Sequence, residues 1–256
     1  MPSTERSAQP IGPVAALLLM PLCFALVALA GAITLRWGLA GVAAAQVTAF
    51  ALPAWLVARA PGPPARVLSL VRPSGRALFG AALLAVSFWY LSAALLAPLV
   101  DDLVTERETE MLAEQFFGPE PLAVKLLVLA VVPAVCEELL VRGAIARGLR
   151  PRLGLFGAAL LSSLYFAALH GSLARLPITF TLGMVLAIVA LRSGSVVTAM
   201  MIHAGNNAAA VLLTQPHLAG AARLLGEQAA LFLPAAALAS GIGLWLVWQS
   251  ASPRTD

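Results

Sequence analysis

Three ionisable side chains stand close together in a long apolar stretch of the sequence. Positions 133–143 run Pro-Ala-Val-Cys-Glu-Glu-Leu-Leu-Val-Arg-Gly, which places Glu137, Glu138 and Arg142 near one another. A charge in the middle of a bilayer costs at least ~2.5–3.5 kcal/mol, so such residues need a reason. In a helix Glu138 and Arg142 share a face as an i,i+4 pair, whereas Glu137 points about 100° away. Glu137 therefore has no partner in its own helix and can act as a general base.

Two of the three histidines also fall in apolar stretches. Phe166 and His170 are four residues apart, hence on one helical face, and His203 shares a face with Asn206 and Asn207. A buried glutamate with two histidines and an asparagine can activate a water molecule and stabilise an oxyanion. Hydrolysis of an amide bond requires both.

Metal binding is the competing chemistry, because glutamate and histidine are also metal ligands. In that case Glu137, His170 and His203 would bind zinc. No His-Glu-x-x-His motif occurs, which argues against a zincin-type site. The aspartates lie outside the apolar stretches, at 101, 102 and 256, which excludes a protease built on two buried aspartates.

The elements that carry these residues must be membrane-spanning helices, because the chain is too apolar for a soluble domain. Of its 256 residues, 61% are hydrophobic and 11% are charged, and the mean hydropathy is +0.92. A soluble domain carries about a quarter charged residues, and about 20 apolar residues cross a bilayer as a helix. We therefore predict an all-α, polytopic membrane protein of about eight transmembrane helices with a buried polar site. The predicted spans are at about 11–33, 38–58, 77–100, 122–146, 154–170, 176–192, 195–214 and 229–248.

The basic residues predict how the chain is oriented. With the N-terminus in the cytoplasm, the cytoplasmic side collects arginines 6, 59, 66, 72, 76, 147, 150, 152, 192 and 254, and the other side collects residues 36, 107, 125, 175 and 223. This bias predicts a multi-pass protein of the cell (inner) membrane with both termini in the cytoplasm. The arginines between apolar segments do not indicate nucleic-acid binding. The acidic stretch 101–119 is expected outside the membrane, as a surface helix or loop.

Counting along the predicted helices tests whether the polar residues can meet. At 1.5 Å per residue from the cytoplasmic ends, Glu137 lies roughly 14 Å deep, His203 roughly 12 Å and His170 about 24 Å. Helix tilt or a bend would have to absorb this difference. Pro133 cannot donate to the carbonyl of Leu129 and should bend the helix close to the site.

Three motifs occur in order, each in its own apolar stretch. They are Glu-Glu-x-x-x-Arg at 137–142, Phe-x-x-x-His at 166–170 and His-x-x-x-Asn at 203–207. Together they resemble the CAAX protease and bacteriocin-processing (CPBP, or Abi) family, which contains the type II CAAX prenyl endopeptidases. The similarity covers roughly residues 120–212, and it implies an intramembrane endopeptidase of eight helices whose site opens to water.

The resemblance also implies roles for the catalytic residues. Glu137 with His170 would activate the attacking water, and His203 with Asn207 would form the oxyanion site. Asn206 faces the same side as Asn207 and could share or take its role. The family was formerly classed with the metalloendopeptidases, and we favour a glutamate mechanism without a cofactor over the zinc alternative.

The remaining motif residues would support the site. The resemblance assigns Glu138 and Arg142 to the scaffold, and Phe166 completes the second motif.

The expected organisation has three parts. Residues 1–120 hold three transmembrane helices and the acidic extramembrane segment, 121–214 the catalytic core of four spans, and 215–256 the last helix and a polar tail. The expected partners are membrane lipid and a peptide or protein substrate with a membrane-associated segment. A prenylated C-terminus, a leader peptide and a C-terminal sorting tail are all open as substrates.

Two functions other than proteolysis are compatible with the same residues. One is a non-catalytic membrane scaffold or immunity protein of the same fold, in which the polar cluster only pairs helices. The other is a small transporter that uses Glu137 and the histidines as a proton relay. The complete set of Glu, two His and Asn favours the enzyme, because a scaffold does not need an oxyanion donor.

Overall fold

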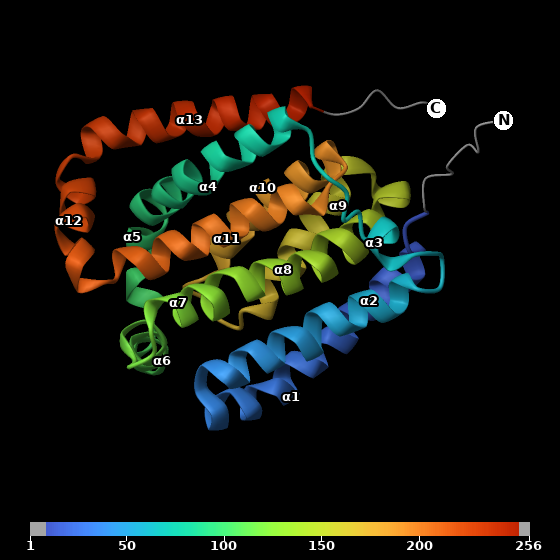
Figure 1. Cartoon of the computed structure of the whole chain (residues 1–256), viewed down its shortest axis with the longest axis horizontal. Helices are drawn as coiled ribbons and strands as arrows, with labels where there is room; N and C mark the ends of the chain where they lie inside the picture. Colours follow the sequence, from blue (N-terminus) through green and yellow to red (C-terminus); the bar gives the residue numbers. More distant parts are fainter. Residues whose placement is uncertain (1–8, 251–256) are drawn as a thin grey trace.

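The chain is built from helices in its described part. The computed structural model describes residues 9–250, with 31–35 and 117 described by their backbone only, and no strand occurs within these residues. Six helices in this range are long and apolar enough to cross a membrane. The long helices run broadly along one direction and pack side by side (Figure 1). The protein is therefore an all-α, multi-pass membrane protein, as predicted.

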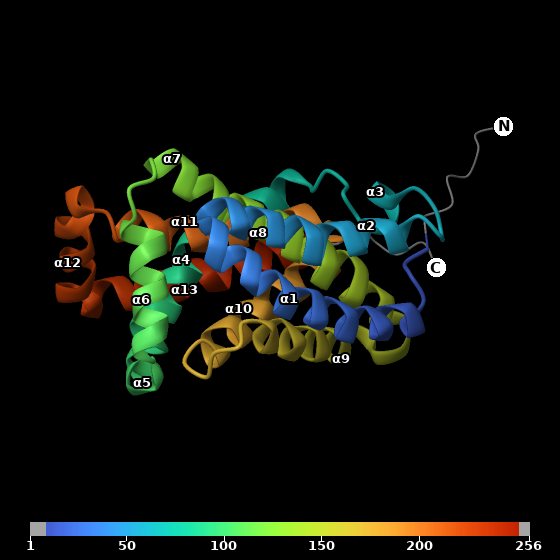
Figure 2. The same cartoon turned by 90° about the horizontal axis from the view of Figure 1, so that it is seen from below.

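The N-terminal part forms a helical hairpin. Helix α1 (Pro13–Gln46) breaks at Gly38, whose φ of 53° is a left-handed conformation that glycine adopts without strain. The chain turns back there and continues through the π-helical η1 (Val47–Ala51) into α2 (Leu52–Ala58). The first two predicted spans are the two arms of this hairpin, which lie together in Figures 1 and 2.

Helices α4 (Gly75–Leu95) and α13 (Ala229–Gln249) pack against each other although they are distant in sequence (Figure 1). A Cβ atom on Gly80 would lie 2.6 Å from the carbonyl oxygen of Gly243, and one on Gly243 would lie 2.8 Å from that of Gly80. Only glycine at both positions allows the backbones this close. Small residues at such a contact are typical of helix packing in membranes.

The central helices carry the predicted site. The segment 122–146 is one continuous helical stretch composed of α7 (Leu122–Lys125), η3 (Leu126–Val131), α8 (Val132–Glu138) and η4 (Leu139–Ala146), in which η3 and η4 are π-helical. It is followed by α9 (Arg147–Leu169), α10 (Leu176–Ser193) and α11 (Val196–Leu213).

The fourth and fifth predicted spans differ from the other six. Both are helical, but neither is among the six helices that are long and apolar enough to cross a membrane. The fourth carries ionisable residues and changes between α- and π-helix. The fifth is shortened by a break at Gly154, whose φ is 68°. In a membrane both segments need the neighbouring helices around them, because their polar groups must be satisfied by protein.

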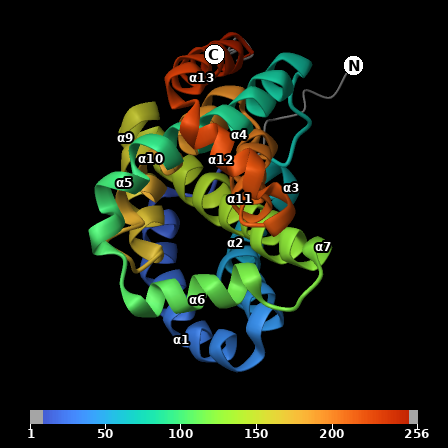
Figure 3. The same ribbon diagram turned by 90° about the vertical axis from the view of Figure 1, so that its left-hand side faces the viewer.

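Short helices connect the spans at both ends of the bundle. They are α3 (Pro64–Val67), α5 (Ala97–Val100), η2 (Asp101–Leu103), α6 (Glu106–Phe117), η5 (Pro216–Leu218) and α12 (Ala219–Glu227). Helix α6 is the surface helix expected from the acidic stretch, and it begins with a capping box between Thr105 and Glu108. Figure 3 shows α6 lying across one end of the bundle. Most of the predicted polar tail, and Arg6 and Arg254 of the charge count, lie outside the described residues.

Candidate active site

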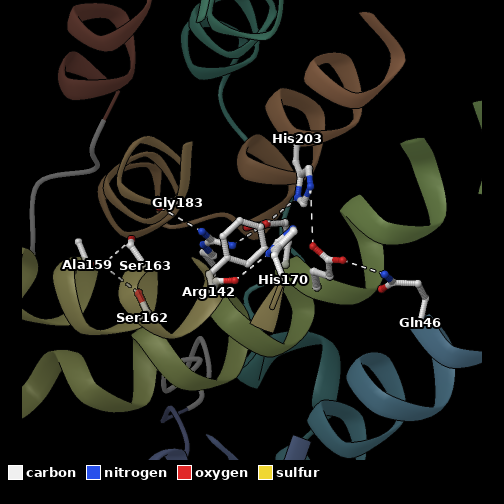
Figure 4. Close-up of polar contacts among 11 residues, drawn as sticks. Gln46, Arg142, Ala159, Ser162, Ser163, His170, Gly183 and His203 are labelled. Carbon is white, nitrogen blue, oxygen red and sulfur yellow. Dashed lines mark hydrogen bonds and ion pairs between the residues drawn. The ribbon is translucent and has the colours of Figure 1, made fainter. Parts of the chain in front are cut away.

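The predicted ion pair of the central helix is present and sealed from solvent. Arg142 Nη1 donates to Glu138 Oε1 at 2.7 Å, and both side chains are 0% exposed. Arg142 Nη2 donates to the carbonyl oxygen of Gly183 in α10 at 3.1 Å. A Cβ atom on Gly183 would lie 3.3 Å from Arg142 Nη2, so glycine leaves the room that this contact needs. The pair thus joins the central helix to α10 (Figure 4).

His203 of α11 lies between the two glutamates. Its Nδ1 is 2.9 Å from Glu138 Oε1, and its Nε2 is 3.8 Å from Glu137 Oε2. Glu138 Oε1 also accepts from Arg142, so it behaves as a carboxylate and His203 Nδ1 is the donor. If His203 also donates from Nε2, its imidazole ring must carry a proton on each of its two nitrogens.

The ring of Phe166 in α9 contacts three basic side chains of the site. The Arg142 guanidinium lies over the Phe166 ring, 4.4 Å from its centroid. The same ring makes edge-to-face contacts with His170 and His203, at centroid distances of 4.9 and 5.7 Å. The two histidines, predicted at different depths, are thus brought to one aromatic ring.

Glu137 faces a cavity and receives its hydrogen bond from another part of the chain. Gln46, at the end of α1, donates from Nε2 to Glu137 Oε1 at 2.8 Å (Figure 4). Glu137 Oε2 and Gln46 Oε1 are buried and have no hydrogen-bond partner within the described residues. Both residues line a cavity of about 430 Å³. Two unsatisfied acceptors beside a cavity suit a small donor such as water.

His170 lines the same cavity, directly after the end of α9. Its Nδ1 is 2.9 Å from the carbonyl oxygen of Phe166. A carbonyl oxygen can only accept, so Nδ1 carries the proton, and Nε2 of the neutral ring has a free lone pair. No hydrogen bond joins His170 to Glu137 directly within the described residues. A group in the cavity between them would have to connect the two side chains.

The asparagines stand further along α11. Asn207 Nδ2 donates to the carbonyl oxygen of Leu129 at 3.3 Å, and Asn206 Nδ2 approaches Asn207 Oδ1 at 3.5 Å. Pro133 has no backbone N–H to donate to the carbonyl oxygen of Leu129, so the side-chain amide of Asn207 supplies the donor there. The π-helical η3 ends just before Pro133. One N–H of the Asn207 amide remains for another acceptor.

The predicted ligands of the zinc alternative do not gather into a metal site. Within the described residues, no group of three or more His, Cys, Asp or Glu side chains lies in positions that could hold a metal ion. His203 Nδ1 is already committed to Glu138, and His170 Nδ1 to a backbone carbonyl.

Helix α6 forms a wall of the site that the sequence did not indicate. Arg107, Met111 and Gln115, spaced four residues apart on one helical face, line the cavity that holds Glu137 and His170. Hydrogen bonds from Ser172 and Thr105 hold the pKa of Glu108 at about 2, and the bond from Ser172 has the larger effect. The bond from Ser172 also attaches the start of α6 to the loop after His170.

The far end of α6 is anchored as well, because Lys125 Nζ donates to the carbonyl oxygen of Phe116 at 2.8 Å.

Gln46, which bonds Glu137, was also not predicted from the sequence. Its only signal in the sequence is an amide side chain within an apolar span.

Comparison with known proteins assigns a family to the central helices. Residues 119–209 match the family model described as Type II CAAX prenyl endopeptidase Rce1-like. The matched residues include all three sequence motifs and make up less than half of the chain. At the general level, the match supports an intramembrane CAAX-type protease, in agreement with the resemblance found in the three motifs. No curated protein and no solved structure matches the chain. Gln46 and α6, which line the same cavity as Glu137 and His170, lie before the matched residues.

Proposed function

We propose that the protein is an intramembrane endopeptidase that hydrolyses a peptide bond of a membrane-anchored or membrane-adjacent substrate. Glu137 and His170 activate the attacking water, and His203 with Asn207 stabilises the oxyanion. The observation that carries the proposal is the shared cavity of Glu137 and His170, beside a second glutamate whose Oε1 is bonded to Arg142 and His203. The Rce1-like match supports the class of reaction.

The two unsatisfied acceptors suggest how water is held for attack. A water molecule that donates one O–H to Glu137 Oε2 and the other to Gln46 Oε1 keeps a lone pair for the substrate carbonyl. Glu137 takes a proton as the water oxygen bonds to the carbonyl carbon and the carbonyl π electrons move to oxygen. These electrons then re-form the carbonyl and the C–N bond breaks. Glu137 returns the proton to the leaving amine, either directly or by first passing it to Nε2 of His170, which then delivers it.

The oxyanion of the transition state forms next to His203 in this proposal. Its Nε2 points toward Glu137 Oε2, and its Nδ1 is held by Glu138, so the ring cannot turn away. As an imidazolium it donates to the developing negative charge, together with the remaining N–H of Asn207. Donors held in advance by other bonds stabilise a transition state without reorganising.

The proposed reaction uses no cofactor, and its substrate is a peptide with a membrane-associated segment. A C-terminal sorting tail or a leader peptide fits better than a prenylated protein. The Arg-rich, Ala-rich composition suggests a bacterium of high genomic GC content, in which prenyl-protein processing is less expected. We place the protein in the inner membrane with both termini in the cytoplasm.

Substitution of Glu137 tests the proposal. Glu137→Gln keeps the shape of the side chain and can still accept from Gln46, but it cannot take a proton. We expect cleavage of a fluorogenic peptide in detergent to be abolished, with normal abundance and thermal stability. Glu114→Gln, on the exposed side of α6, is the matched control and should be fully active. Full activity of Glu137→Gln would contradict the proposal and favour the scaffold.

A further inference from the structure

A basic cavity lies at the end of the bundle away from α6. It has a volume of about 810 Å³ and forms where the start of α4 meets the ends of α10 and α13 (Figure 1). Its lining includes Arg72, Arg150 and Arg192, and no acidic residue lines it among those the structure describes. This cavity shares no residue with the candidate active site.

Among the residues that the structure describes, no acidic side chain pairs with Arg72 or Arg192 of this cavity. The acidic residues within 9–250 lie at 101–120, in the central pair 137–138, and at 227. The helices that carry 101–120 and 227, α6 and α12 among them, lie toward the other end of the bundle (Figure 1). Within the described residues, neither Arg72 nor Arg192 forms an ion pair. An excess of positive charge in a cavity favours an anionic ligand.

Two of the arginines are held in place by backbone carbonyls. Arg192 Nη2 donates to the carbonyl oxygen of Trp248 at 3.0 Å, and its guanidinium lies over the Trp248 ring, 3.9 Å from the centroid. Arg150 Nη1 donates to the carbonyl oxygen of Leu191 at 2.8 Å. A guanidinium has five N–H donors, so these bonds orient Arg192 and leave other donors for a ligand. Arginine in a fixed plane is well suited to a phosphate group.

The start of α4 adds a second source of positive potential. Ser74 lines the cavity and caps this 21-residue helix, since its Oγ accepts from the backbone N–H of Ala77 at 3.2 Å. The first N–H groups of a helix and its dipole favour an anion. The cavity thus combines arginine side chains with the N-terminal end of a long helix.

The cavity opens beside a lipid-facing helix. On α13, Leu238, Trp245 and Trp248 are 67%, 59% and 44% exposed, and tryptophan is enriched where the membrane meets water. Apolar chains of a lipid can lie along this face while the headgroup enters the cavity. A free anion would gain nothing from that face. We propose that this cavity binds the phosphate of an anionic phospholipid headgroup.

Neutralising two arginines tests the proposal in the full-length protein. Purified protein in detergent is titrated with phosphatidylglycerol, phosphatidylcholine or inorganic phosphate, and retained lipid is measured by native mass spectrometry. We expect clear preference for phosphatidylglycerol over phosphatidylcholine, and no displacement by millimolar inorganic phosphate. Arg72→Gln/Arg192→Gln should weaken phosphatidylglycerol binding about twenty-five-fold, because each arginine near an anionic lipid contributes about fivefold.

The control removes the same charge elsewhere. Arg36→Gln/Arg223→Gln neutralises two exposed arginines at the other end and should bind phosphatidylglycerol like the wild type. Arg72→Gln alone disturbs no hydrogen bond of the described chain and should weaken binding about fivefold even if the double variant folds poorly. Equal binding by Arg72→Gln and wild type, or equal retention of the two lipids, would overturn the proposal. Saturable binding of phosphate that displaces the lipid would assign the cavity to a free anion and also overturn it.

Discussion

Glu137 and Glu138 are neighbours in the sequence but occupy two different environments. Glu138 is fully buried, shares one oxygen between Arg142 and His203, and is not among the residues that line the cavity of Glu137. Glu137 is 7% exposed, accepts one hydrogen bond from Gln46, has an unsatisfied second oxygen and lines a cavity. A buried carboxylate paired with a cation braces helices, whereas a carboxylate that lines a cavity can exchange a proton with a group held there.

The difference arises because the two faces of one helix meet different elements. The Glu138 face packs against α10 and α11, which supply Gly183 and His203. The Glu137 face meets the N-terminal hairpin, which supplies Gln46. The Glu138–Arg142–His203 cluster, which we call the brace, is therefore built inside the matched segment 119–209. The open site around Glu137 needs Gln46 from outside that segment. The following substitutions separate the two environments.

Loss of the brace should have the largest effect. Arg142→Ala leaves Glu138 as a buried charge without its counter-ion, which costs about 3–5 kcal/mol. We expect low protein levels and a much lower thermal unfolding temperature in detergent, rather than a folded, inactive enzyme. The control Arg152→Ala removes an exposed arginine and should be neutral. Normal abundance and stability of Arg142→Ala would show that the ion pair does not support the fold.

On the open side, the oxyanion donor should have the next largest effect. Asn207→Ala removes the remaining amide N–H, and we expect turnover to fall by about 10²–10³-fold, roughly 2.7–4 kcal/mol, with little change in KM. Asn206→Ala, which removes only the long contact to Asn207 Oδ1, should cost mainly a little stability. Steady-state kinetics of both variants with a fluorogenic peptide decide the assignment. An inactive Asn206→Ala beside an active Asn207→Ala would reverse it.

Gln46 should have a smaller effect, because it positions Glu137 and does not react. Gln46→Ala removes the hydrogen bond to Glu137 Oε1 and one acceptor for water. A hydrogen bond to a charged group is worth about 1.5–3 kcal/mol, so we expect kcat to fall at least about tenfold with KM little changed. A matched control is Gln215→Ala, whose amide bonds only neighbouring residues of its own segment. Unchanged kcat in Gln46→Ala would show that Glu137 needs no support from the hairpin.

Removal of metal should have no effect. If Glu137 and His170 activate water directly, activity survives dialysis against a strong chelator, and no stoichiometric metal copurifies. Elemental analysis of the purified protein and the cleavage assay before and after dialysis measure this. Recovery that depends on added zinc would make Glu137, His170 and His203 ligands instead.

Several features followed from the sequence alone because they depend on local geometry or composition. The apolar content required membrane helices, and i,i+4 spacing required Glu138 and Arg142 to share a face, as they do. The same geometry separated Glu137 from that pair. The sequence motifs also pointed to the family that the comparison found. Within the described residues, six of the eight predicted spans are long and apolar enough to cross a membrane by themselves, and the other two are interrupted by polar groups or by the break at Gly154.

Only the tertiary structure decided how the site is completed. Counting residues placed His170 about 10 Å deeper than Glu137, yet both line one cavity, and the Phe166 ring touches both histidine rings. The bonds from Gln46 to Glu137 and from Asn207 to Leu129 span 91 and 78 residues. Such contacts depend on how whole helices pack, because packing sets their tilt, rotation and depth, and residue spacing within one helix carries no information about these quantities.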